Sequence, residues 1–212
     1  MIDIRIFYTK RGRIRYISHL DMNRLMQRAL SRAKLPVWFT QGFNPHLYLT
    51  FPLPLSLGFE SDYEMMDIRL CDPLPMEEVR DRLNAQMPEG LSVLEAAPPQ
   101  MKAAQIAFCD YTVTLRGHAA AEWEEFLAGP IVVEKKTKRG VSEMDIRPHL
   151  TLLGLEEREG ETALSLRCAS GPVFNLNPSL PVEAFCRRYG YEAPDVSYLK
   201  TAVRAAGGDW FR

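Results

Sequence analysis

The stretch SHLDMNRLMQRALSRAKLP, residues 18–36, decides how the first half of the chain folds. Ser18 is a residue type that caps helices, and Pro36 is one that stops them. Between the two, apolar residues recur every three or four positions, which gives a helix one buried face. They are Met22, Leu25, Met26, Ala29, Leu30 and Ala33. The stretch therefore predicts an amphipathic helix, with Arg24, Arg28 and Arg32 spaced four residues apart on another face.

Outside this helix the apolar pattern changes to the alternation that is typical of strands. IRIFYTK (4–10) precedes the helix, and after a glycine turn KRGRIRYI (10–17) reads as a second short piece of strand. The later strands and the second helix are predicted at LPVWFTQ (35–41), LYLTFPL (47–53), EMMDIRLC (64–71), PMEEVRDRLNAQM (75–87) and LSVLEAAPP (91–99). The order β-α-β-β-α-β predicts a ferredoxin-like unit over residues 1–100.

The second half repeats this kind of pattern less regularly. PPQMKAAQ (98–105) has the composition of a linker, and residues 106–212 again alternate predicted strands and helices. PSLPVEAFCRRYG (178–190) is predicted as a helix that ends at Gly190. We therefore expect an α+β protein with two ferredoxin-like (βαββαβ) or related α/β-sandwich units in tandem. EMMDIRL and EMDIRPHL are similar, but such short matches only suggest a duplication.

Charge is distributed unevenly along the 212 residues, although the net charge is only −1. Residues 1–50 carry nine lysines and arginines against two acidic residues, whereas residues 51–100 carry three against ten. The basic first quarter indicates a surface for nucleic acid or phosphate, or alternatively a segment that pairs with the acidic one after it. KKTKRG (135–140) is a basic loop that suits a phosphate backbone or a solvated turn.

The sequence also predicts the cell compartment. The beginning of the chain lacks the apolar core of a signal peptide, and no run approaches the length of a membrane span. The four cysteines, Cys71, Cys109, Cys168 and Cys186, form no CxxC pair. This spacing excludes the usual zinc-ribbon and iron–sulfur motifs and is typical of reduced thiols. We expect a cytoplasmic protein with no membrane partner.

Several motifs together resemble one family. They are SHLD, the R-x-x-x-R-A-L-x-R-A-x-L-P helix, QGFNPH, a loop ending in LxxG, the strand E-x-x-D-I, and RGVSEMDIRPHL in the second half. In these motifs the chain resembles the radical-SAM-linked domain of unknown function, which occurs as a separate chain or as a C-terminal fusion to radical SAM proteins. The resemblance implies a radical SAM protein as partner, and the family's gene neighbourhoods point toward RNA or a ribosomal component.

The cofactors that the resemblance implies are expected in the partner alone. The C-x-x-x-C-x-x-C signature that holds a radical SAM cluster does not occur in this chain. We therefore expect this chain to bind no cofactor, with the iron–sulfur cluster and S-adenosylmethionine confined to the partner enzyme.

Candidate substrate-binding residues lie at the start of the basic helix. Ser18 at a helix start leaves backbone N–H groups facing outward, which suits an anion. His19 and Asp21 could project beside that site, with Arg24 and Arg28 on the following turns. The alternatives are that Ser18 or Asp21 only caps the helix and that the arginines form a solvated face.

The second set of candidates is the loop QGFNPH, with Gln41, Gly42, Phe43, Asn44 and His46. Gly42 permits a backbone conformation that a side chain would block, and Asn44 is restricted because a proline follows it. Phe43 could stack on a base of single-stranded RNA, or it could fill the core beneath a tight turn.

Two functions follow from these residues. The preferred one is an accessory module that binds RNA or a ribonucleoprotein and presents it to a radical SAM enzyme. The alternative is a ribonuclease or phosphoesterase in which His19 and His46 are catalytic, either without a metal or with one held by His19, Asp21 and His46.

Overall fold

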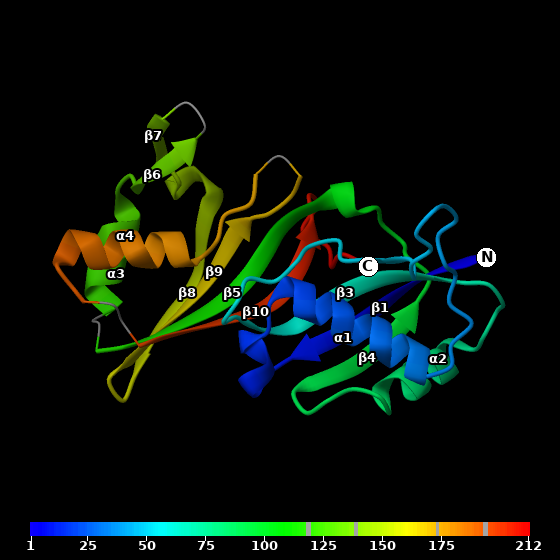
Figure 1. The fold of residues 1–212 in the computed structure, drawn as a ribbon. Coiled ribbons are helices and arrows are strands. Elements are labelled where there is room, and N and C mark those ends of the chain that lie inside the picture. Colours follow the sequence, from blue (N-terminus) through cyan, green and yellow to red (C-terminus); the bar gives the residue numbers. More distant parts are fainter. Residues whose placement is uncertain (118–119, 138–139, 173, 193–194) are drawn as a thin grey trace. The chain divides into compact units, whose positions relative to one another are not determined.

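The structure is a computed structural model that describes residues 1–117, 120–137, 140–172, 174–192 and 195–212. Its strands and helices group into two units (Figure 1). The first unit contains Met1–Gln105 together with Phe211–Arg212, and the second contains Ile106–Trp210. Both units combine strands and helices, which confirms the prediction of an α+β protein.

The first unit is built on antiparallel strands in the order β4-β1-β3-β2. In β1 and β3, Ile4 lies opposite Ile68 and Arg5 lies opposite Asp67. The elements are β1 (Ile2–Lys10), the 3₁₀ helix η1 (Gly12–Tyr16), α1 (His19–Arg32), β2 (Leu49–Thr50), β3 (Glu60–Leu70), α2 (Met76–Asn84), β4 (Leu91–Ala97) and η2 (Ala103–Gln105).

The helix α1 forms as its apolar stripe predicts. Ser18 caps it, and Met22, Met26, Ala29 and Leu30 are buried. They share a hydrophobic core with the even-numbered residues of β1 (Ile4, Ile6 and Tyr8) and of β3 (Met66, Ile68 and Leu70). Because neighbouring residues of a strand face opposite sides, the odd-numbered Arg5 and Asp67 lie on the other face of this sheet.

Three predicted strands of the first unit are wrong or much shorter than expected, and one of them, LYLTFPL (47–53), is reduced to the two residues of β2. The segment KRGRIRYI turns at Gly12, whose φ of +68° lies in the left-handed region, and residues Gly12–Tyr16 form the 3₁₀ helix. The segment LPVWFTQ makes only isolated bridges, Val37 with Leu70 and Phe39 with Leu47. Pro36 and Pro45 have no N–H to donate to a strand ladder, which accounts for the interrupted pairing there.

The second unit has its own antiparallel strands in the order β10-β5-β9-β8, with β6 and β7 as a separate hairpin. Its elements are β5 (Ile106–Arg116), α3 (Ala120–Ala128), β6 (Val132–Thr137), β7 (Gly140–Asp145), the 3₁₀ helix η3 (Arg147–His149), β8 (Leu150–Arg158), β9 (Glu161–Ala169), α4 (Ser179–Tyr189) and β10 (Val196–Ala205). The predicted end of α4 is confirmed, since Gly190 closes it with a φ of +73°.

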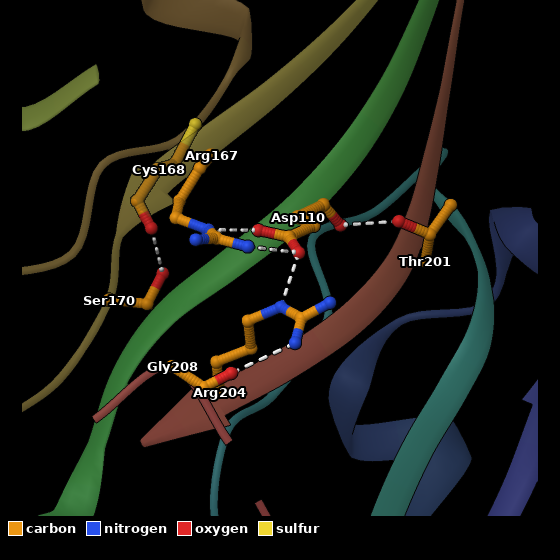
Figure 2. A network of polar contacts seen from close by, with 7 residues as sticks. All are labelled: Asp110, Arg167, Cys168, Ser170, Thr201, Arg204 and Gly208. Carbon is orange, nitrogen blue, oxygen red and sulfur yellow. Dashed lines mark hydrogen bonds and ion pairs between the residues drawn. The ribbon is translucent and has the colours of Figure 1, made fainter. Parts of the chain in front are cut away.

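A three-residue ion network holds the strands of the second unit together (Figure 2). Arg167 of β9 donates two hydrogen bonds to the Asp110 carboxylate of β5, at 2.7 and 2.9 Å. Arg204 of β10 donates a third at 2.5 Å. Two guanidinium groups therefore meet on one carboxylate.

The described part of the chain contains no helix that is both long and apolar enough to cross a membrane.

Candidate functional site

The first turn of α1 is tied together by hydrogen bonds that begin at Ser18. The Ser18 hydroxyl accepts a bond of 3.1 Å from the Asp21 N–H and donates one of 2.8 Å to the Asp21 carboxylate. Arg24 then donates to the same carboxylate at 3.3 Å. Ser18 is thus a capping residue, as one reading of the sequence held, and the cap also fixes the side chain of Asp21 beside Arg24.

The arginines of α1 line a groove of about 620 Å³ between this helix and the turn after α2. Its lining residues are Ile17, Asp21, Arg24, Leu25, Arg28, Arg32, Ala85, Gln86, Met87 and Pro88. Arg32 donates to the carbonyl oxygen of Gln86 at 3.1 Å and to its side-chain oxygen at 3.3 Å. Three guanidinium groups and one carboxylate, that of Asp21, give this groove a positive charge.

Arg28, at the centre of the row, differs from its two neighbours. Its side chain is exposed, and no other described residue forms a hydrogen bond or ion pair with it. Arg24 and Arg32, by contrast, are held by Asp21 and Gln86. The two ends of the row are therefore positioned by the protein, while all the donors of Arg28 remain available for a ligand.

His19 lies at the edge of a second, much smaller cavity of about 10 Å³, which is roughly the size of one water molecule. Its ring meets the edge of Phe51 with the centroids 5.1 Å apart. Tyr8, Lys10 and Glu64, all of them buried, line the same cavity. Burial raises the pKa of the Tyr8 hydroxyl, and the nearby charge of Glu64 raises it further.

The buried Lys10 and Glu64 are further candidate functional residues, which the sequence motifs do not include. The alternation of buried and exposed residues along the two strands could have indicated them. Lys10 follows Ile4, Ile6 and Tyr8 on the face of β1 that packs against α1, and Glu64 precedes Met66 on the matching face of β3. A charged residue on a buried face is rarely found without a structural or functional reason.

The loop at residues 40–46 is closed at its base by its own residues. Thr40 N–H donates to the His46 carbonyl oxygen at 2.8 Å, and His46 N–H donates to the Thr40 hydroxyl at 3.1 Å. Nδ1 of His46 lies 3.0 Å from that hydroxyl and 3.1 Å from the carbonyl oxygen of Asn44. His46 thus stabilises the loop, and its ring contacts are with the loop.

Phe43 does not fill the core, contrary to one reading of the sequence. Its relative exposure is 110%, and Gln41, Gly42, Asn44 and His46 are exposed around it. The loop therefore presents an aromatic ring to solvent, and the exposed residues Gln41 and Asn44 lie near it in the sequence.

The two predicted histidines, both in the described part of the chain, make no contact with each other. Among the described residues, no hydrogen bond or ring contact joins His46 to His19, Ser18 or Asp21. The described residues also contain no group of three histidine, cysteine or acidic side chains that could hold a metal ion. His19, Asp21 and His46 therefore do not form the ligand set that their residue types suggested. Lys138 and Arg139 of the predicted basic loop lie outside the described residues.

One protein family matches this chain. A search of curated proteins finds no match. The profile of the family DUF2344, described as an uncharacterized protein conserved in bacteria, matches residues 3–178. This match covers most of the 212 residues, including the helix α1, its groove and the loop at 40–46. The chain therefore belongs to the bacterial DUF2344 family.

Proposed function

We propose that this protein is an accessory RNA-binding subunit of the bacterial cytoplasm, which presents RNA or a ribonucleoprotein to a partner radical SAM enzyme. The observation that carries the RNA-binding part is the groove with Arg24, Arg28 and Arg32 along α1. The partner is suggested by the resemblance of SHLD, QGFNPH and the other motifs to radical-SAM-linked proteins.

The spacing of the three arginines suits a nucleic-acid strand. Four residues of an α-helix rise about 6 Å, so the arginines repeat at a distance comparable to that between successive phosphates of one strand. A guanidinium group can donate two parallel hydrogen bonds to a phosphate. Arg28 would contact the central phosphate, and its fixed neighbours Arg24 and Arg32 would contact the flanking ones.

The proposal also includes the finer description of the fold as two ferredoxin-like units. With the β6–β7 hairpin left aside, both units have a helix between their first and second strands and another between their third and fourth. In both, the strand order is fourth, first, third, second. Small α+β sheets of this type are common RNA-binding scaffolds, which supports the proposal by analogy.

Substitution of Arg28 tests the groove. We expect Arg28→Ala to weaken binding of a short single-stranded RNA about five- to tenfold and to reduce the slope of log K against log salt by about 1. Binding would be followed by fluorescence anisotropy between about 50 and 200 mM salt. Arg82→Ala is the matched control, because Arg82 lies on α2, is similarly exposed and is paired with Glu78.

Equal effects of the two substitutions would assign the binding to overall charge and would remove the groove from the proposal. Absence of RNA binding by the wild-type protein at low salt would overturn the RNA-binding function itself. Co-expression with the radical SAM protein tests the partner separately, and failure of the two proteins to co-purify would contradict that part. Cleavage of RNA that disappears in His46→Ala would instead favour the ribonuclease.

A further inference from the structure

The loop around QGFNPH is the tip of a short hairpin whose base is stiffened by aromatic rings. Tyr48 N–H donates to the Trp38 carbonyl oxygen at 3.0 Å, and Phe39 bridges to Leu47. The rings of Trp38 and Tyr48 meet edge to face with their centroids 5.8 Å apart. The guanidinium group of Arg69 lies over both rings, at 5.4 and 4.9 Å.

The two ends of the tip are held together by the bonds between Thr40 and His46. Gly42 allows the sharp turn before Phe43, since its φ of +140° is unfavourable for other residues. A Cβ atom at this position would have no neighbour within 4 Å. The backbone at Gly42 is therefore not packed against another part of the protein, and the Phe43 ring that follows it is exposed.

The surroundings of Phe43 indicate what kind of molecule it contacts. Within residues 41–45, Pro45 is the other residue with an apolar side chain, and the half-exposed Phe39 lies just outside this stretch, at its bridge to Leu47. A hydrophobic pocket of a protein partner would favour further apolar residues beside the aromatic one. A nucleobase, by contrast, has a flat face that stacks on an aromatic ring and a polar edge that pairs with amides such as those of Gln41 and Asn44.

We propose that residues 40–46, which we call the aromatic finger, stack Phe43 on an unpaired base of the bound RNA. This inference rests on the proposed RNA-binding function and narrows its substrate to RNA with at least one unstacked base. The groove on α1 would contact phosphates and give affinity that depends on salt. The aromatic finger would contribute through stacking, which does not release counterions and so does not depend on salt in that way.

Binding of a short RNA that contains 2-aminopurine tests the aromatic finger. Stacking on an aromatic side chain quenches this fluorescent base, and we expect quenching by the wild-type protein and by Phe43→Trp. Phe43→Ala and Phe43→Leu should both abolish the quenching. Loss of a stacked base corresponds to about a 5- to 150-fold weaker affinity, with an unchanged salt slope. Because Phe43 is fully exposed, these variants should unfold at the wild-type temperature.

Two controls separate stacking from simpler explanations. Leu57→Ala removes an apolar side chain of 63% exposure from another loop of the same unit and should leave affinity and quenching unchanged. A fully paired duplex of the same sequence should bind Phe43→Ala and wild type equally, because its bases are already stacked.

The outcomes distinguish the two proposals. RNA binding by the wild type that Phe43→Ala leaves intact, or that Phe43→Leu fully preserves, would overturn the aromatic finger while the groove stands. Normal RNA binding of Phe43→Ala combined with loss of co-purification of the radical SAM protein would make the loop a protein contact and overturn the base contact. No RNA binding by the wild type would overturn both.

Discussion

Each of the two units contains an ion pair between its first strand and a neighbouring strand, with the charges exchanged. In the first unit, Arg5 of the first strand lies opposite Asp67 of the third strand. In the second unit, Asp110 of the first strand, β5, lies opposite Arg167 of β9. Both pairs use two hydrogen bonds from one guanidinium group to one carboxylate. A cross-strand ion pair thus forms in either orientation, with the arginine on the first strand in one unit and the aspartate on the first strand in the other.

The surroundings of the two pairs differ more than their geometry. Arg5 has a side-chain exposure of only 2%, and besides Asp67 it contacts the Met101 carbonyl oxygen at 3.0 Å and the Phe211 ring at 4.5 Å. Asp110 is the buried member of the other network, while Arg167 and Arg204 keep 28% and 22% exposure (Figure 2). The first unit thus buries its cation, whereas the second unit buries its anion.

The largest effect is expected when the buried cation loses its carboxylate. Asp67→Asn leaves the charge of Arg5 where water reaches it poorly, so we expect a loss of about 3 kcal/mol in the free energy of unfolding. Urea denaturation measures this loss. Asp3→Asn is the matched control, because Asp3 pairs with Arg69 in the same strand pair but is 52% exposed, and it should cost under about 1 kcal/mol. Equal losses in the two variants would contradict the importance of burial.

A smaller effect is expected in the second unit, although more hydrogen bonds are broken there. Asp110→Asn removes a partner from both Arg167 and Arg204, but each guanidinium group can turn to water. We expect a loss of about 2 kcal/mol by urea denaturation. Glu161→Gln, which breaks the exposed pair with Arg116 on the same two strands, should change stability little. A larger loss for Asp110→Asn than for Asp67→Asn would show that the number of bonds, and not burial, determines the cost.

Much of the fold could be predicted because it depends on local patterns. The stripe from Met22 to Ala33 gives α1, and Gly190 gives the end of α4, because helix periodicity and capping act within a few residues. The segment 10–17 could not be predicted in the same way. Its alternation is that of a strand, but strand pairing ends at Lys10, and the turn at Gly12 leads into a 3₁₀ helix.

The candidate site could be predicted only in part, for a related reason. The spacing of Arg24, Arg28 and Arg32 gives their common face, but the opposite wall of the groove comes from Gln86 and Met87, more than 50 residues later. The residue types of His19 and His46 suggested a shared catalytic or metal site, yet Nδ1 of His46 contacts Thr40 and Asn44. The pairs Arg5–Asp67 and Asp110–Arg167 depend on strand register, which short-range pattern does not determine.

The smallest expected effect is the loss of the second unit's ion network at low pH. Burial by itself raises the pKa of Asp110, but the hydrogen bonds and charges of Arg167 and Arg204 outweigh it and leave this pKa below its ordinary value. Since the folded pKa lies below the unfolded one of about 3.9, the network stabilises the fold fully above that pH. Its contribution declines as the pH falls toward the folded pKa.

Urea denaturation of wild type and Asp110→Asn at pH values from about 7 to about 3 measures this decline. The stability difference between them should be constant near neutral pH and should shrink below about pH 4, since a protonated Asp110 resembles asparagine in charge. The change should be only part of the roughly 2 kcal/mol lost at neutral pH. A difference that stays constant down to pH 3, or that grows, would mean that the arginines do not stabilise the ionised Asp110. The network in the second unit would then act through packing and hydrogen-bond geometry and not through its charges.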